Sequence, residues 1–231
     1  MKAIVLAGGL GTRLADVTAG LPKPMAPVGS RPFLEHLLDY LIEQGVDAVV
    51  LAVSYRWEVI RDHFGDAYRG MSLAYSVEDE PLGTGGAIRQ ALDLAGQEEV
   101  VVFNGDTLFP VDLAALRAAH RAAGATLTMA LKHVDDCGRF GRVEVSREGV
   151  ITGFLEKGGS GAGWINGGVY WLDRRLFLDY SMSGRFSFEQ DLVEPHIGSI
   201  RPAVFMSDAW FIDMGVPEDY HRLQRRIGGE S

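Results

Sequence analysis

An apolar run near the start of the chain opens directly into glycines, and this junction restricts the fold more than any other segment. The run Ala3-Ile4-Val5-Leu6-Ala7 has the composition of a buried strand, and Gly8-Gly9-Leu10-Gly11-Thr12-Arg13-Leu14 follows at once. Because glycine has no Cβ, the backbone N–H groups of such a loop can approach a phosphate chain closely. Arg13, and Lys23 in Pro22-Lys23-Pro24, add positive charge, and both are expected on exposed loop backbone. The segment therefore predicts a strand that leads into a cradle for a triphosphate.

Two better-known glycine loops do not fit this sequence. A P-loop ends in Gly-Lys followed by Ser or Thr, and a dinucleotide-binding fingerprint needs a third glycine where this chain has Leu14. A glycine-rich turn after a strand can also be purely structural. The added Thr12-Arg13 pair and the Pro-Lys-Pro step favour phosphate binding over that alternative.

The composition is typical of a globular enzyme. The 231 residues are 47% hydrophobic and 23% charged, which is enough to bury a sizeable core in one domain. The formal net charge is -9 and no basic cluster is longer than Arg225-Arg226, which argues against a nucleic-acid or membrane surface as partner. Cys137 is the single cysteine, and the first apolar stretch is too short for a signal peptide. We therefore expect a cytoplasmic protein, with its oligomeric state left open and a homodimer included.

Strand and helix patterns alternate through the first half of the chain. Pro32 leads a helix whose apolar residues recur at helical spacing from Phe33 to Ile42, and Gly45 ends it. The other expected elements are strands at 48–53, 73–77 and 100–103 and helices at 57–64 and 84–94. This rhythm predicts an α/β fold with a doubly wound, mostly parallel (Rossmann-like) mixed sheet flanked by helices.

The pattern changes beyond residue 125. Segments at 126–132, 142–145 and 169–172 predict strands, with shorter helices between them, and hence a β-rich substrate lobe. The glycine-rich run 158–163 is typical of a flexible surface loop.

Two aspartates follow predicted strands. The run Val100–Phe103 leads into Asn104-Gly105-Asp106, and Trp210-Phe211-Ile212 leads into Asp213 beside a glycine. Ligands of an open parallel sheet gather beyond the carboxyl ends of its strands, although an aspartate there can also simply form a turn. Two carboxylates together with phosphate oxygens are the usual ligands of Mg²⁺. The sequence therefore predicts Asp106 and Asp213 as metal ligands, with Mn²⁺ as a substitute.

With the glycine loop, the Lys-Pro step and both aspartates, the chain resembles the sugar-1-phosphate nucleotidyltransferases over almost its whole length. The resemblance implies the nucleotide-diphospho-sugar transferase fold and transfer of a nucleoside monophosphate to a sugar 1-phosphate. It implies that Arg13 binds the β and γ phosphates, that Lys23 faces the α phosphate, and that Asp106 and Asp213 hold Mg²⁺. It also divides one expected domain, 1–231, into a mainly nucleotide-binding half, 1–125, and a mainly sugar-binding half, 126–231.

The resemblance also implies the sugar contacts. Glu156 would accept sugar hydroxyls, Lys157 would meet the sugar phosphate, and the backbone of Gly141 and the side chain of Asn166 would touch the sugar. On spacing alone, Glu156 and Lys157 are more typical of a solvated surface pair, and Gly141 and Asn166 fit a turn and a buried strand end equally well. The family often has proline after the lysine, where this chain has Gly158.

The segment from Tyr75 to Gly86 is expected to bind the base. Guanine presents its N1–H and N2–H donors together, and one carboxylate can accept both, whereas uracil and thymine are better matched by a carboxamide. Glu78 therefore favours GTP, with Glu80 as the alternative, and Thr84 can also cap the following helix. The expected nucleotide-binding residues are Leu6, Ala7, Gly8, Gly9, Gly11, Thr12, Arg13, Lys23, Glu78, Pro81, Gly83 and Thr84.

Three functions compete at this point. Segments such as 81–88 and 186–189 look closest to enzymes that make GDP-heptose for bacterial surface glycans from GTP and D-glycero-D-manno-heptose 1-phosphate. A mannose-1-phosphate guanylyltransferase and an N-acetylmuramate-1-phosphate uridylyltransferase are the alternatives within the family. A non-catalytic sugar-nucleotide sensor would be expected to lose Arg13, Lys23 or an aspartate, and all are present. A glycosyltransferase would be expected to carry Asp-x-Asp where this chain has Asn104-Gly105-Asp106.

Overall fold

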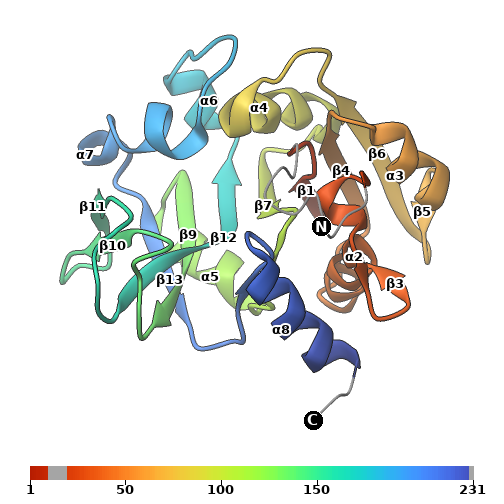
Figure 1. Ribbon diagram of the computed structural model, residues 1–231. Coiled ribbons are helices and arrows are strands. Elements are labelled where there is room, and N and C mark those ends of the chain that lie inside the picture. Colours follow the sequence, from red (N-terminus) through yellow and green to blue (C-terminus); the bar gives the residue numbers. More distant parts are fainter. Residues whose placement is uncertain (10–19, 229–231) are drawn as a thin grey trace.

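An eight-stranded sheet forms the centre of the protein, and helices flank it (Figure 1). The structure is a computed structural model and describes residues 1–9 and 20–228. The strand order is β13-β9-β12-β7-β1-β4-β6-β5. The strands are β1 (Lys2–Leu6), β4 (Ala48–Val53), β5 (Ala67–Tyr68), β6 (Met71–Val77), β7 (Glu99–Asn104), β9 (Leu127–Val134), β12 (Gly163–Asp173) and β13 (Ala203–Ser207).

Within this sheet, β5 and β12 run against the other six strands. β1 pairs in parallel with β4 and β7, and β4 pairs in parallel with β6. β12 lies antiparallel between β7 and β9, and β13 pairs in parallel with β9 at the edge. The predicted mixed, mostly parallel sheet is therefore confirmed, and the β-rich second half of the chain extends it by three strands, β9, β12 and β13.

The helices lie within a few residues of their predicted positions where a prediction was made. They are α2 (Phe33–Glu43), α3 (Trp57–Phe64), α4 (Gly83–Ala95), α5 (Leu113–Ala123), α6 (Arg175–Asp179), α7 (Ile197–Ile200) and α8 (Pro217–Gly228), with a 3-10 turn η2 (Lys23–Met25) and a π-helix η3 (Phe188–Val193). Pro32 belongs to a short strand before α2 rather than to its first turn, since its extended backbone (ψ 147°) precedes the helix. The chain in the described residues contains no helix long and apolar enough to cross a membrane.

Three short strand pairs lie outside the central sheet. They are β2 (Pro27–Val28) with β3 (Arg31–Pro32), β8 (Thr107–Leu108) with β14 (Ile212–Asp213), and β10 (Arg142–Val145) with β11 (Ile151–Leu155). The glycine-rich run is exposed up to residue 162, but Gly163 is buried as the first residue of β12. Backbone hydrogen bonds from Gly158 N to Gly138 O (2.8 Å) and from Cys137 N to Gly161 O (3.0 Å) hold this run against the preceding turn.

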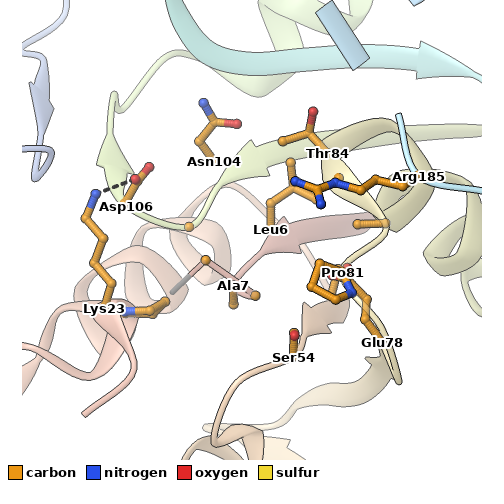
Figure 2. A pocket seen from close by; sticks show the side chains of 17 residues that line it. Leu6, Ala7, Lys23, Ser54, Glu78, Pro81, Thr84, Asn104, Asp106 and Arg185 are labelled. Carbon is orange, nitrogen blue, oxygen red and sulfur yellow. Dashed lines mark hydrogen bonds and ion pairs between the residues drawn. The ribbon is translucent and has the colours of Figure 1, made fainter. Parts of the chain in front are cut away.

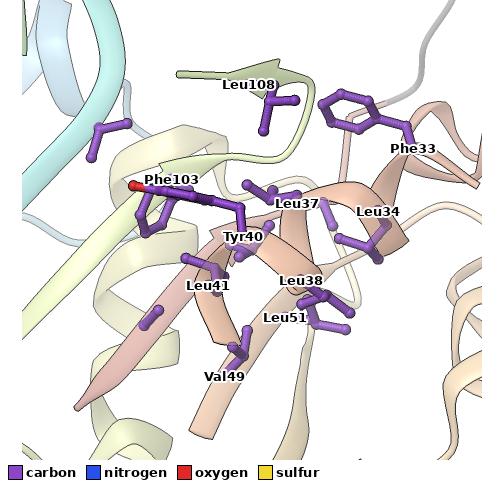
Figure 3. Close-up of a cluster of buried hydrophobic side chains, with 14 of the residues drawn as sticks. Phe33, Leu34, Leu37, Leu38, Tyr40, Leu41, Val49, Leu51, Phe103 and Leu108 are labelled. Atoms are coloured by element: carbon purple, nitrogen blue, oxygen red, sulfur yellow. The ribbon is translucent and has the colours of Figure 1, made fainter. Parts of the chain in front are cut away.

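The hydrophobic core lies on both faces of the sheet, because alternate residues of a strand point to opposite sides. Ala3 and Val5 of β1 join the cluster that packs against α2, whereas Ile4 joins the cluster under α4. Figure 3 shows the first cluster, in which Tyr40 of α2 meets Phe103 of β7 edge-on, with the ring centroids 6.1 Å apart. Burial on both faces explains why β1, β4 and β7 are continuous apolar runs rather than alternating ones.

Candidate active site

The register of the parallel strands brings three loops to one edge of the sheet. Leu6 at the end of β1 lies opposite Ala52 of β4 and Asn104 of β7. Gly8 therefore lies beside Ser54, which follows β4, and the end of β1 lies beside Gly105, which follows β7. A cavity of about 360 Å³ opens there (Figure 2). It lies where ligands of open α/β sheets gather.

Most of the predicted nucleotide-binding residues line this cavity, which we call the first pocket. They are Leu6, Ala7, Gly8, Gly9, Lys23, Glu78, Pro81, Gly83 and Thr84, joined by the predicted metal ligand Asp106. Gly11, Thr12 and Arg13 lie outside the described residues. Their predicted roles therefore stay predictions.

Gly8 passes directly against the Glu78 carboxylate. A Cβ at Gly8 would lie 2.9 Å from Glu78 Oε1 and 3.3 Å from Ser54 Cβ, so a larger residue would displace the Glu78 carboxylate or the loop. Gly105 makes a similar approach on the other side, where its N–H donates to the Leu6 carbonyl oxygen at 2.9 Å. Two of the sequence glycines thus permit the close backbone packing that shapes the first pocket.

Lys23 and Asp106 form an ion pair at one end of the first pocket. Lys23 Nζ donates to Asp106 Oδ2 at 2.5 Å, as Figure 2 shows. The expectation of an exposed lysine is wrong, because Lys23 sits on η2 with a side chain only 10% exposed. Pro22 and Pro24 fix the turn that holds it. A cation and a carboxylate are therefore fixed side by side where the strands end.

Asp213 reaches the same corner by a different route from the one the sequence suggested. The apolar run before it does not end a strand of the central sheet, because β14 has only two residues and pairs with β8. In this antiparallel pair Asp213 lies opposite Thr107, and Met214 N donates to the Asp106 carbonyl oxygen at 2.9 Å. The two predicted metal ligands are thus adjacent in space.

The electrostatics of this corner suit a cation. Burial, and then the negative charge of Asp106, raise the pKa of Asp213, while Lys23 lowers it. The described residues contain no group of three or more His, Cys, Asp or Glu side chains that could hold a metal ion. Two carboxylates of this kind fit a hard divalent cation whose other ligands are phosphate oxygens and water.

The other end of the first pocket holds Glu78. Its Oε2 accepts a hydrogen bond from Leu82 N at 2.8 Å, and burial raises its pKa. Glu80, the alternative base contact, is exposed and is not among the lining residues. Thr84 does not cap α4, because that helix begins at Gly83 and Thr84 Oγ1 accepts from Phe188 N at 2.9 Å. Of the two glutamates considered for the base, Glu78 is thus the one that lines the cavity.

Arg185 is a first-pocket residue that sequence reasoning missed. It lines the same cavity as Thr84 (Figure 2), although the two residues lie 101 positions apart in the chain. Its position follows from Phe186, whose carbonyl oxygen accepts from Gly85 N at 3.0 Å and whose ring packs where a Cβ at Gly85 would lie. Glycines inside a helix signal such a close neighbour, but they do not say which segment it is.

A second pocket of about 380 Å³ lies over β10, β11, β12 and η3. All four predicted sugar-binding residues line it: Gly141, Glu156, Lys157 and Asn166. Gly141 has φ +79°, and a Cβ there would lie 2.8 Å from the Leu155 carbonyl oxygen, so this turn requires glycine. The second pocket therefore unites residues that are separate in the sequence.

Asn166 uses its amide within the protein. Its Nδ2 donates to Tyr170 Oη at 2.7 Å and to Glu189 Oε1, while its Oδ1 accepts from Gly168 N at 2.9 Å. The register of β12 against β9 shifts between Asn166 and Tyr170, which marks a bulge at this point. Asn166 therefore lines the second pocket while its amide satisfies polar groups around this bulge within β12, rather than at the end of a strand. Glu189, Gln190, Glu194 and Arg142 also line the second pocket and were not predicted.

Helix α8 connects both pockets. Arg139 Nη2 donates to the buried Asp219 at 2.7 Å, next to the turn that carries Gly141. Tyr220, the next residue, and Gln224, on the following turn, donate through Oη and Nε2 to the Pro27 carbonyl oxygen, close in the chain to Lys23. The helix thus fixes one element beside each pocket.

Comparison with known proteins agrees with this geometry. The family model described as nucleotidyl transferase matches residues 2–229. A D-glycero-alpha-D-manno-heptose 1-phosphate guanylyltransferase from Aneurinibacillus thermoaerophilus is 46% identical over 227 residues, which are 98% of each chain. A mannose-1-phosphate guanylyltransferase from Mycobacterium tuberculosis is 36% identical over 96% of this chain and 63% of its own. The crystal structure of HddC from Yersinia pseudotuberculosis complexed with GMP-PN superimposes with a TM-score of 0.88 at 35% identity, covering 98% of this chain and 99% of the other. The protein therefore belongs to the nucleotidyl transferase family.

Proposed function

We propose that the protein transfers GMP from GTP to D-glycero-D-manno-heptose 1-phosphate and releases pyrophosphate. The observation that carries this proposal is the first pocket, which has a half-buried carboxylate, Glu78, at one end and Lys23 with Asp106 at the other. The relative from Aneurinibacillus thermoaerophilus supports the choice of both substrates. The complex of HddC with GMP-PN supports a guanine nucleotide.

The residues of the first pocket would divide the work between base and phosphates. The Glu78 carboxylate would accept the N1–H and N2–H groups of guanine, a pattern that pyrimidines lack. Lys23 would neutralise the α phosphate, and Arg13 would bind the β and γ phosphates. The attacking oxygen of the sugar phosphate is already ionised at neutral pH, so alignment and charge neutralisation suffice and no general base is needed.

Asp106 and Asp213 would hold Mg²⁺, or Mn²⁺ in its place. Both offer hard oxygen ligands, and a bound cation would offset the burial and the negative charge of Asp106 that raise the pKa of Asp213. When bound, the metal would supply positive charge to the phosphate groups. Lys23 Nζ, which is bonded to Asp106 in this structure, would then be free to turn toward a phosphate.

The second pocket would bind the sugar. Lys157 would meet the phosphate of the sugar, Glu156 and Asn166 would meet its hydroxyls, and Gly141 would contribute its backbone. We also propose that 1–231 forms one domain, since both core clusters contain residues from both halves of the chain. The cytoplasmic location and the oligomeric state stay predictions.

The test is a substrate panel with purified protein. Pyrophosphate release is measured for GTP, UTP and dTTP, each paired with heptose 1-phosphate, mannose 1-phosphate and N-acetylmuramate 1-phosphate. We expect GTP with heptose 1-phosphate to give the highest kcat/KM. A clear preference for UTP would refute the guanine assignment, and equal or better use of mannose 1-phosphate would refute the heptose assignment.

A further inference from the structure

One wall of the second pocket is formed by the π-helix η3 and the residue that follows it. Glu194 N donates to the Glu189 carbonyl oxygen at 2.8 Å, which is the i to i+5 hydrogen bond of a π-helix. Such turns are rare and frequently occur at functional sites. Glu189, Gln190 and Glu194 all line the second pocket from this wall.

The wall is fixed at both of its sides. Glu189 Oε1 accepts from Tyr170 Oη at 2.5 Å and from Asn166 Nδ2, which ties the π-helix to β12. At its start, Phe188 N donates to Thr84 Oγ1 at 2.9 Å, which ties it to α4 beside the first pocket. The backbone that carries Gln190 and Glu194 is therefore held in place before a ligand arrives, which lowers the cost of binding.

Gln190 and Glu194 are the polar side chains of this wall that the protein does not use. Both are exposed, and neither side chain has a hydrogen bond or an ion pair with another described residue. Glu189, by contrast, already accepts two hydrogen bonds. An amide and a carboxylate with unused hydrogen-bonding capacity thus face the second pocket together.

The heptose differs from mannose by one terminal hydroxymethylene group, and the ring hydroxyls and the phosphate are common to both. The residues assigned to ring and phosphate, Glu156, Lys157, Gly141 and Asn166, serve either sugar equally. We propose that Gln190 and Glu194 bind the terminal hydroxyl of the heptose and so set the preference for heptose 1-phosphate over mannose 1-phosphate. This inference rests on the proposed function. A carboxylate accepts a hydroxyl proton, and an amide can donate to the same oxygen.

The test compares Gln190→Ala, Glu194→Ala and the double variant with the wild type on both sugar 1-phosphates, at saturating GTP. Loss of a hydrogen bond to a charged group predicts that Glu194→Ala lowers kcat/KM for heptose 1-phosphate by roughly tenfold to a hundredfold. The value for mannose 1-phosphate should stay within about twofold, because mannose lacks the terminal group. Glu194→Gln, which keeps an acceptor, should recover part of the loss. Glu43→Ala, an exposed glutamate on α2 that lines neither pocket, is the matched control and should change neither value.

The ratio of kcat/KM for heptose 1-phosphate to that for mannose 1-phosphate distinguishes a role in specificity from a structural role. Variants that lose both activities in equal proportion would overturn the inference, and so would variants that keep the wild-type preference for the heptose. Failure of the proposed function is visible earlier, in the wild type alone, as equal or better use of mannose 1-phosphate. Failure of the inference appears only in the variants of a wild type that does prefer the heptose.

Discussion

Replacing Glu78 by glutamine tests the base assignment most directly. The structure determines which way the new amide must turn. Leu82 N–H already donates to Glu78 Oε2, so the glutamine oxygen would take that hydrogen bond and the NH₂ group would face the first pocket. There it would meet the N1–H and N2–H donors of guanine, so that donors oppose donors.

The expected loss follows from this geometry. Hydrogen bonds to a charged acceptor are worth about 1.5–3 kcal/mol each, and Glu78 is only half-buried, so we expect about 1–3 kcal/mol in total. Glu78→Gln should therefore lower kcat/KM for GTP by roughly fivefold to 150-fold. The value for UTP should hold or rise, because an amide suits the acceptor-donor-acceptor edge of uracil. Pyrophosphate release from GTP and UTP, measured in parallel, gives the ratio.

The same substitution should make the unliganded protein more stable at neutral pH. Burial raises the pKa of Glu78 in the folded state, so the folded protein binds a proton more readily than the unfolded chain does. The stability that this proton contributes is present below the ordinary pKa of a glutamate and is lost as the pH rises through the raised value. Glutamine stays neutral and avoids that loss. The free energy of unfolding of Glu78→Gln at pH 7.5 should therefore exceed that of the wild type, which shows that a loss of GTP use is not a loss of fold.

A matched control is Glu80→Gln, on the same segment but exposed and outside the first pocket. It should leave the ratio of GTP to UTP unchanged. An unchanged ratio in Glu78→Gln would refute base recognition by this carboxylate. A changed ratio in Glu80→Gln alone would move that role to the neighbouring residue.

Three further predictions concern the phosphate end and the core. Asp106→Asn and Asp213→Asn should each lower kcat by about two to four orders of magnitude, and near-normal turnover in either folded variant would refute the metal site. Lys23→Ala should lower kcat strongly and also destabilise the fold, because it removes a buried lysine and leaves Asp106 unpaired; urea unfolding measures the second effect. Burial lowers the pKa of His120, so its contribution to stability is complete above about pH 6.5 and falls as the pH drops below it. The free energy of unfolding should therefore differ less between pH 5 and pH 7.5 in His120→Asn than in the wild type.

The parallel half of the sheet could be predicted from the sequence because its strands are buried on both faces. Val49 and Val101 belong to one core cluster and Val50 and Val102 to the other, so no polar residue interrupts the pattern. Helices that connect such strands favour a parallel sheet with right-handed crossovers, and in a parallel sheet the carboxyl ends of β1, β4 and β7 lie at the same edge. The first-pocket residues at the ends of these strands followed from this arrangement, and Glu78 followed from its place after β6.

Positions that depend on short or irregular segments could not be predicted in the same way. A strand of two residues such as β14 has no periodicity. The sequence therefore predicted that Asp213 lies near Asp106, but it did not predict that β14 pairs with β8 outside the central sheet. The burial of Lys23 depends on its contact with Asp106, 83 residues away, and no local pattern encodes that contact. For Arg185 the sequence did contain one signal. Glycines have low helix propensity, and their presence inside α4 indicates that another segment packs closely there, which in the structure is Phe186, the neighbour of Arg185.

The unpredicted wall of the second pocket also depends on an irregular segment, the π-helix, and it contacts an element that lines the first pocket. Thr84 lies in the segment expected to bind the nucleotide, yet its hydroxyl accepts from Phe188 N at the start of the π-helix that lines the second pocket. Glu189, next in the chain, accepts from Asn166 and Tyr170 on the other side. A nucleotide that orders the start of α4 would therefore also order the wall that we assign to the heptose. The nucleotide should therefore raise the affinity for heptose 1-phosphate by some factor, and because coupling between two binding sites is reciprocal, heptose 1-phosphate should raise the affinity for the guanine nucleotide by that same factor. Thr84→Val should reduce this factor while it leaves the Glu78 contact in place.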